Sequence, residues 1–432
     1  MRVLLVATNR YDRVNNRMNA QPMPIGLAYI AGHLDRERHE VKVVDLMFAE
    51  DYLAEIEQTV REFQPHVVGI SLRNLSNHSY LNTQWALPIT KDVIDRIREH
   101  SSATIIVGGP AFSLLPKQCF EFLQPDLGVA GDAGETFAEV CNRIEIGERP
   151  AYDLPGVVHA RDGQIVLNEG LCVSAFASRP RLEDLEMDKY RNAGFGIGVL
   201  TKLGSFSYPT PASTAGMTDA DFRVIRPVDE VVDEVKELWE KYQLKKVFFV
   251  DNGFNFPLDH AKSLCSALIE ADIGVRWNTC LASFNCDAEL VRLMRDAGCA
   301  LVLMGNRGGD PHDGLGSMEE QMEGQLEVPR LCEEGGLHYT VARTFGEPGE
   351  TRESVEHKLD FLRRINPALA NLRVGVSIMP GSDVAALALE EGIISDEAEL
   401  IEPTFYVAGE VRDWIVPYLK EQAAGNPRWN LW

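Results

Sequence analysis

The chain has 432 residues, of which 45% are apolar and 25% are charged, and its formal net charge is −23. This length suits two domains plus a tail, and the composition is that of an ordinary globular protein. The negative charge argues against nucleic acid or an anionic membrane as a partner, because both require a basic face. The first apolar segment, Arg2–Ala7, is too short for a signal sequence, and no apolar run approaches the ~18 residues of a membrane span. We therefore expect a soluble, cytoplasmic protein.

Short apolar strands alternate with amphipathic helices over residues 1–145. The strands are predicted at Val3–Ala7, Val41–Asp45, Val67–Ser71, Thr104–Gly108 and Leu127–Ala130. The helices between them are predicted at Ile25–Leu34, Tyr52–Phe63, Lys91–His100 and Glu135–Ile144. This α/β alternation is typical of a doubly wound, Rossmann-like parallel sheet, whose ligand lies at the carboxyl ends of the strands.

Glycine-rich loops follow three of these strands. They are the segments 69–74, 107–112 and 131–135, and the second of them contains Gly108, Gly109 and Pro110. Glycines at such positions let the backbone approach a flat or bulky ligand and leave N–H groups for its polar edge. A sheet of the same kind that binds no ligand is the alternative interpretation.

A hairpin is predicted over residues 156–167, around Asp162 and Gly163, and an acidic linker follows at 179–190. The βα alternation then resumes with a longer repeat. Its strands are predicted at Gly196–Thr201, Lys246–Asp251, Gly274–Thr279, Ala300–Gly305, Tyr339–Thr344 and Arg373–Met379. Its helices are predicted at Pro227–Tyr242, Leu258–Ala271, Ala288–Ala297, Met318–Glu334, Arg352–Ile365 and Val384–Glu391.

An aromatic-rich tail follows from about residue 396. It contains Phe405, Tyr406, Trp414, Tyr418, Trp429 and Trp432. Such a tail either shields a site in the preceding domain from water or packs as an ordinary terminal helix.

Motifs in both halves resemble the cobalamin-binding radical S-adenosylmethionine enzymes. In the first half they are Pro-x-Gly-Leu at 24–27, Val-x-Val-x-Asp at 41–45, Pro-x-Val-Val-Gly-Ile-Ser at 65–71, Val-Gly-Gly-Pro at 107–110 and Gly-Asp-x-Gly-Glu at 131–135. In the second half they are the segments 226–235, 247–255, 346–351 and 379–383. The resemblance extends from residue 1 to about residue 395.

The resemblance implies a cobalamin-binding Rossmann-like domain at 1–145, a hairpin and linker at 146–190, a partial (β/α)6 TIM-like barrel at 191–395 and a tail at 396–432. It also implies that the cobalamin is bordered by Ser71, Asn74, Gly108, Gly109, Pro110, Gly131 and Glu135.

Classical corrinoid domains carry a cobalt-binding histidine in a D-x-H-x-x-G motif after the first strand. This chain has Asp12-Arg-Val-Asn-Asn-Arg17 there, without a histidine. We therefore expect base-off cobalamin without a protein histidine ligand. His33 and His78 remain as alternatives, either as ligands or as ordinary core and surface residues.

The chain departs from this family where three cysteines should bind an iron–sulfur cluster. In the two possible registers those positions hold Ser205, Pro209 and Ala212, or Phe206, Thr210 and Ser213. Hydroxyl groups do not hold a [4Fe–4S] cluster, so we expect none, and binding of S-adenosylmethionine itself is put in question. The eight cysteines show no C-x-x-C spacing, which is typical of buried, reduced thiols.

Four residues are the catalytic candidates. Asp251 and Arg343 stand at strand ends, where they are expected to face the mouth of the barrel, and they rank ahead of Glu350. Asn306 and Arg307 replace the Glu-Ser pair of the family, and their chemistry suits either an anion or an outward salt bridge.

A compact group at Asp310, His312 and Asp313 has metal-ligand chemistry. The surrounding run of glycine and aspartate is also typical of a solvated loop, so we predict no metal site.

Two functions follow from these features. The first is a cobalamin-dependent enzyme that performs alkyl transfer or C–C bond formation on a small metabolite in specialised biosynthesis, without radical S-adenosylmethionine chemistry. The alternative is a catalytically inactive cobalamin-binding accessory protein that partners a cluster-bearing relative. A third possibility keeps the fold but not the cobalamin.

Overall fold

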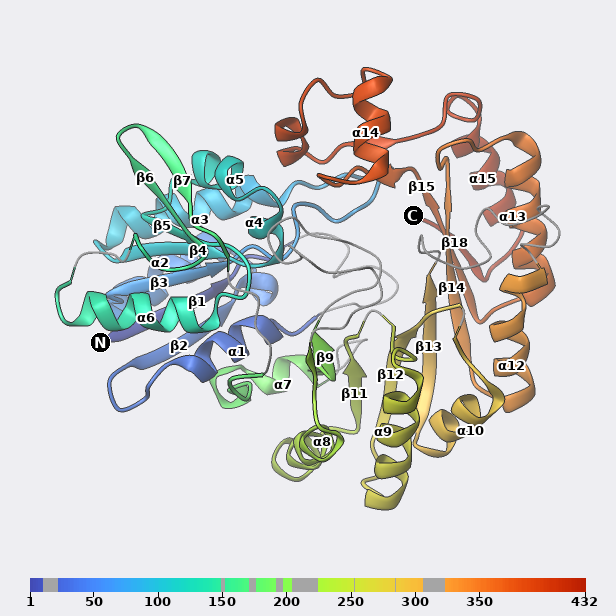
Figure 1. Cartoon of the computed structure of the whole chain (residues 1–432), viewed down its shortest axis with the longest axis horizontal. Helices are drawn as coiled ribbons and strands as arrows, with labels where there is room; N and C mark the ends of the chain where they lie inside the picture. The colour runs from blue at the N-terminus through green and yellow to red at the C-terminus, as the bar shows by residue number, and fades with distance from the viewer. Residues whose placement is uncertain are drawn as a thin grey trace.

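The computed structural model describes residues 1–10, 22–148, 152–170, 176–191, 197–203, 224–251, 253–283, 285–305 and 323–432. Two seven-stranded sheets form two bodies that lie side by side, with the first at the left of Figure 1 and the second at the right. Within these residues no helix is both long and apolar enough to cross a membrane.

The first sheet has the order β2-β1-β3-β4-β5-β6-β7. Its parallel strands are β1 (Arg2–Ala7), β2 (Glu40–Asp45), β3 (Val67–Ser71), β4 (Thr104–Gly108) and β5 (Leu127–Val129). The connecting helices are α1 (Ile25–His33), α2 (Tyr52–Phe63), α3 (Ala86–His100), α4 (Pro110–Leu114), α5 (Pro116–Leu123) and α6 (Gly134–Glu145). The central strands β1, β3 and β4 are almost wholly buried because helices cover both faces, which confirms the Rossmann-like prediction.

The predicted hairpin is present as β6 (Val157–Arg161) and β7 (Gln164–Leu167). Asp162 and Gly163 both have positive φ, at 51° and 76°, as a two-residue hairpin turn requires. Strand β6 pairs antiparallel with β5, so the hairpin extends the first sheet and is not a separate connection.

The second sheet has the order β18-β15-β14-β13-β12-β11-β8. Its strands, all parallel, are β8 (Ile197–Val199), β11 (Lys246–Phe249), β12 (Arg276–Leu281), β13 (Cys299–Gly305), β14 (Tyr339–Phe345), β15 (Leu369–Val374) and β18 (Trp429–Leu431). The helices are α8 (Val228–Tyr242), α9 (Leu258–Ala271), α10 (Ala288–Asp296), α12 (Glu327–Gly335), α13 (Arg352–Ile365), α14 (Asp383–Glu390) and α15 (Ile415–Ala424). This (β/α) arrangement is the predicted partial barrel.

Several predicted elements differ in position, among them α3, which begins five residues before the predicted helix at 91–100. The strand predicted at 373–379 is β15, which begins four residues earlier, and a separate short strand β16 (Val376–Ser377) pairs antiparallel with β17 (Phe405–Tyr406). Gly375 has φ 75° and interrupts the strand between them. The helix predicted at 318–334 corresponds to α12, and residues 306–322 lie outside the described residues.

The tail does more than the terminal packing or shielding expected for it. After α15, strand β18 joins the second sheet beside β15, with Ala370 opposite Trp429 and Leu372 opposite Leu431. The sheet therefore has a seventh strand that the six predicted βα units did not include.

Side-chain contacts hold the first body against the segment that leads to the second. The hydroxyl of Tyr190, in α7 (Met187–Tyr190), donates to Asp45 Oδ2 at 2.6 Å, and the backbone N–H of Met47 donates to Asp45 Oδ1 at 3.0 Å. Burial raises the pKa of Asp45 to about 6, although the Tyr190 hydrogen bond opposes that shift. The charged form of Asp45 therefore costs stability at neutral pH.

This shift predicts a pH dependence. An unfolded aspartate titrates near pH ~3.9, so the folded state holds the extra proton between about pH 4 and pH 6, and stability falls as the pH rises through this window. In Asp45→Asn that decline should be smaller by about 2 kcal/mol. Unfolding midpoints measured from pH 4 to pH 7 check this. Asp162→Asn, in the exposed hairpin turn, should keep the wild-type profile, and an unchanged slope in Asp45→Asn would contradict the assignment.

Candidate functional site

The two faces of the second sheet have different surroundings. Val247, Phe249 and Trp277 lie with Val235 of α8 and Leu268 of α9, so this face packs against the helices. Neighbouring residues of a strand point to opposite faces, and paired residues of adjacent parallel strands point to the same face, with one register shift between β12 and β13 at Trp277/Asn278. The opposite face, here called the inner face, consists of Gly198, Lys246, Phe248, Arg276, Asn278, Cys280, Leu301, Leu303, Thr340, Ala342, Thr344, Leu369, Asn371, Arg373 and Asn430.

The inner face is turned towards the first body (Figure 1). A Cβ built on Gly198 would lie 3.8 Å from Ile25 Cδ1, at the start of α1. Leu301 and Leu303 belong to the central strand β13, yet both are only half-buried, whereas their neighbours Val302 and Met304 are buried against the helices. The inner face is therefore partly accessible at Leu301 and Leu303, which fits the site expected between the two bodies.

The inner face has a distinctive chemistry. Among the described residues of these strands it carries no carboxylate, and its polar groups are amides, hydroxyls, one thiol and cations at the strand ends. Asn430 Nδ2 donates to Asn371 Oδ1 at 3.2 Å, and Arg373 lies over the Trp432 ring at 4.5 Å from its centroid. This surface suits an apolar or neutral ligand more than one that needs a carboxylate base.

Sequence reasoning did not select these inner-face residues as candidates, although Cys280 or Cys286 was considered as a residue that could face a site and the buried-thiol interpretation was preferred. The strand was predicted at 274–279, two residues before β12, so Cys280 was assigned to a loop. Leu301, Val302, Leu303 and Met304 are all apolar, so the sequence does not distinguish the two faces of β13, and only the paired strands do.

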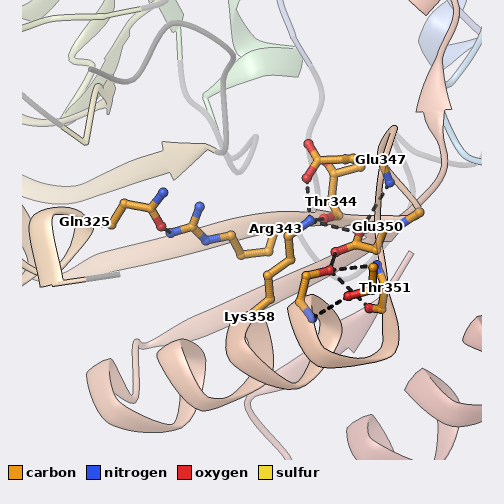
Figure 2. Close-up of polar contacts among 9 residues, drawn as sticks. Gln325, Arg343, Thr344, Glu347, Glu350, Thr351 and Lys358 are labelled. Atoms are coloured by element: carbon orange, nitrogen blue, oxygen red, sulfur yellow. Dashed lines mark hydrogen bonds and ion pairs between the residues drawn. The ribbon is translucent and has the colours of Figure 1, made fainter. Parts of the chain in front are cut away.

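Arg343 lies on the helix-packed face of β14, so the structure does not support its expected position at the barrel mouth. Its guanidinium donates to Gln325 Oε1 at 2.6 Å (Figure 2). It also lies over the Phe361 ring of α13, at 4.2 Å from the centroid. Tyr339, four residues earlier in β14, points to the same face as Arg343, and its hydroxyl donates to Ile365 O at the end of α13. Arg343 therefore packs the strand against helices.

The nearby carboxylates Glu347 and Glu350 form an internal ion cluster (Figure 2). Lys358 Nζ binds both carboxylates and also donates to Thr344 O at 2.9 Å. Glu350 is 4% exposed and accepts the Gly346 N–H at 2.7 Å and the Ser354 hydroxyl at 2.8 Å. Glu350 was ranked below Asp251 as a catalytic candidate. Its hydrogen bonds give it a structural role, because they fix the loop before α13.

Asp251, the leading catalytic candidate, is enclosed by the first strand of the barrel. Its Oδ1 accepts the Thr201 N–H at 3.2 Å, and its Oδ2 accepts the Thr201 hydroxyl. Lys202 Nζ lies 3.6 Å from Oδ2, and both side chains are at most 1% exposed. Burial lowers the pKa of the Lys202 amine, while the Asp251 carboxylate opposes that shift. This geometry favours a role in joining the strand ends.

A second buried ion pair lies beside the first. Arg226 Nη1 donates to Glu234 Oε2 at 2.7 Å and to Leu200 O at 2.8 Å, and it reaches Tyr29 Oη of α1 at 3.5 Å. The Arg226 N–H donates to Thr201 O at 2.8 Å, next to the short antiparallel pair of β9 (Lys202–Leu203) and β10 (Val224–Ile225). The two pairs thus anchor both flanks of residues 204–223, which lie outside the described residues, as do Asn306 and Arg307.

The expected cobalamin residues lie at the carboxyl ends of β3, β4 and β5. Gly109 has φ 104°, and a Cβ on it would lie 2.7 Å from Leu72 O and 3.1 Å from Ser71 Oγ, so these two loops are in close contact. Gly131 has φ 84°, and its N–H donates to Ser113 Oγ at 2.9 Å. Half-buried or exposed positions around them are Ser71, Asn74, Gly108, Pro110 and Glu135. Such a side-chain-poor cradle fits a bulky planar cofactor.

His33 has a structural position. Its Nδ1 lies 2.9 Å from both Tyr29 O and Ser178 Oγ, and a Cβ on Gly134 would come within 2.5 Å of its ring. This supports the interpretation of His33 as a core residue. His78 is half-buried, with φ 54°, in the loop between β3 and α3. Among the described residues, no three His, Cys, Asp or Glu side chains are grouped as metal ligands.

The Asp251–Lys202 pair predicts a large stability effect. Asp251→Asn should lower the free energy of unfolding by about 3–5 kcal/mol, because it removes the carboxylate that neutralises the buried Lys202 ammonium. The double variant Lys202→Met with Asp251→Asn should lose less than the sum of the two single variants. Denaturant unfolding checks this. The exposed pair Lys241–Glu237 is the matched control, since Lys241→Met should cost under about 0.5 kcal/mol. Additive effects at the buried pair would contradict the assignment.

Two protein-family models match the chain. Residues 14–141 match the B12 binding domain, and residues 212–362 match the Radical SAM superfamily. An uncharacterized methyltransferase of Pyrococcus horikoshii is 22% identical over an alignment of 411 residues, which covers 91% of this chain and 84% of that protein. The tryptophan 2-C-methyltransferase of Streptomyces laurentii is 22% identical over 450 residues, covering 87% of this chain and 74% of its own length.

Solved structures share the fold. The radical S-adenosylmethionine methyltransferase TsrM from Kitasatospora setae, with tryptophan and a SAM analogue bound, has a TM-score of 0.80 at 21% identity, covering 99% of this chain and 90% of that chain. The same enzyme with cobalamin and a [4Fe-4S] cluster bound has a TM-score of 0.76 at 20% identity, covering 95% and 84%. Because the two family models match in chain order and the two bodies have the expected fold, the chain combines a B12 binding domain with a domain of the Radical SAM superfamily.

Proposed function

We propose that the chain is a cobalamin-dependent methyltransferase that acts on a small, largely apolar metabolite. The observation that carries the proposal is the similarity along most of the chain to methyltransferases that have the same two domains. The substrate would lie on the inner face of the second sheet, opposite the loops of the first body. Leu301 and Leu303 are half-buried on this face, and the strands of the second sheet carry no carboxylate among the residues that the structure describes. Both observations support an apolar substrate there.

The loops after β3, β4 and β5 would hold the cobalamin. Gly109 and Gly131, with their positive φ, keep side chains out of this cradle, while Ser71, Asn74 and Glu135 offer polar groups around it. When bound, cobalamin supplies a cobalt centre that can accept and donate a methyl group. His33 is occupied by Tyr29 O and Ser178, which supports binding without a histidine ligand.

The proposed reaction also dispenses with an iron–sulfur cluster. The sequence has no cysteine between Cys172 and Cys265, so neither register of the expected cluster loop contains a thiol. Cys119, Cys141, Cys265, Cys299 and Cys332 are buried, and burial raises the pKa of each thiol, which disfavours the thiolate that iron requires. We propose methyl transfer without reductive cleavage of S-adenosylmethionine.

Reconstitution tests the cofactor content. After anaerobic incubation with cobalamin, ferrous iron and sulfide, the protein should retain cobalamin at about one per chain but iron and sulfide well below one per chain. The cobalamin should show no nitrogen ligand from the protein in its electron paramagnetic resonance spectrum. Stoichiometric iron and sulfide, with the signal of a reduced cluster, would overturn the cluster-free proposal. Lack of cobalamin would overturn the whole function.

Methyl transfer itself is tested with isotope. Protein loaded with labelled methylcobalamin is incubated with a small-molecule extract, and products are examined by mass spectrometry for a labelled methyl group. A labelled product that depends on the protein is expected. No labelled product, from protein that holds its cobalamin, would instead favour the accessory role.

A further inference from the structure

Asn278 lies at the centre of the inner face. It is the third residue of β12 and only 4% exposed. Its partners in the sheet are Phe248 on β11 and Leu301 on β13, so the three side chains share one face. Its neighbours Trp277 and Thr279 point to the other face, where Trp277 Nε1 donates to Ala297 O at 2.8 Å.

The carboxamide oxygen of Asn278 is buried and has no hydrogen-bond partner in the described part of the chain. Another buried asparagine in this body behaves differently. Asn255 is 0% exposed, yet its Oδ1 accepts the Ala282 N–H at 2.9 Å and its Nδ2 donates to Asn285 O at 3.1 Å. A buried acceptor without a partner costs about 1–3 kcal/mol, so it points to a group that binds there.

The surroundings of this oxygen restrict what that group can be. Phe248 and Leu301 flank it, and Cys280 and Leu303 form the next pair towards the carboxyl ends of the strands. None of these side chains is a carboxylate or a cation, so a charged ligand group would lose its hydration without an opposite charge. An oxygen acceptor among apolar side chains selects an uncharged group with one hydrogen-bond donor.

We infer that Asn278 Oδ1 is the specificity-determining acceptor of the substrate site, and that it binds an N–H or O–H group carried on an uncharged, apolar part of the substrate. The inference rests on the proposed function, since it gives the substrate class of the same site. An analogue of the same shape that lacks this donor would leave the Asn278 oxygen without a hydrogen bond. The site should therefore bind the donor-bearing molecule more tightly.

The first test needs no ligand. Asn278→Leu keeps the side-chain size and removes the unpaired oxygen, so its unfolding midpoint should equal or exceed that of the wild-type protein. Asn255→Leu, which breaks satisfied hydrogen bonds, should lower the midpoint by several degrees. A loss in Asn278→Leu as large as that in Asn255→Leu would show that Asn278 has a structural partner, and would overturn the inference.

The second test measures binding to the full-length protein with two probes of similar shape. Indole carries an N–H donor, and benzofuran has an oxygen in its place. Indole should bind the wild-type protein about 5- to 20-fold more tightly than benzofuran, and Asn278→Leu should bind the two alike. Equal affinities for the wild-type protein, or no binding of indole at millimolar concentration, would overturn the inference.

These results are distinguishable from failure of the proposed function. The probes are compared with and without cobalamin, and neither test measures methyl transfer. A protein that discriminates indole from benzofuran through Asn278 but transfers no methyl group would keep this binding site and lose the proposed reaction. A protein that transfers a methyl group yet binds the probes alike would keep the reaction and lose the role of Asn278.

Discussion

The in-register parallel pairing of the second sheet is the constraint on which the site depends. Paired residues of adjacent strands point to the same face, apart from one register shift between β12 and β13 at Trp277/Asn278, so alternate side chains line up across the sheet and the others face away. Helices take one of these sets into the core, and the other set faces the first body. A side chain can therefore act in the site only if it points to the inner face. Asn278 points to that face, whereas Arg343 points to the helix-packed face.

The ionisable residues at the strand ends have a shared role. Asp251 pairs with Lys202, Glu234 with Arg226, and Glu350 with Lys358, and each pair joins a strand end or loop to its neighbours. Buried charges of this kind need partners, so they are satisfied within the protein, and no charged side chain lies among the residues that flank Asn278 on the inner face. Such neutral surroundings suit the proposed division of labour, in which a cofactor carries the reactive centre and the protein positions an apolar substrate.

Much of the fold followed from local sequence signals. The bounds of α2, α9 and α13 agree with the prediction to the residue, because caps and apolar periodicity mark both ends of such helices. The arrangement of strands and helices in both bodies was likewise predictable. By contrast, β18 has three residues and pairs with β15 across a long stretch of chain, so no local pattern reveals it.

The candidate site was less predictable than the fold. Position at a strand end suggested Asp251 and Arg343, but a side chain's direction depends on register with strands far along the sequence. A two-residue shift in the end of β12 placed Cys280 in a loop, whereas Asn278 lay within the predicted strand but its face could not be assigned without the neighbouring strands. The contact between Tyr29 and Arg226 joins residues from different bodies, and no spacing in the sequence indicates it.

The position of β18 has a consequence for how the chain is synthesised. Until residues 429–431 leave the ribosome, β15 is an unpaired edge whose backbone groups and apolar side chains are available to other chains. The first sheet, by contrast, has all its strands by residue 167 and can fold early. The nascent second body is thus the part of the protein that most needs protection from aggregation during its production.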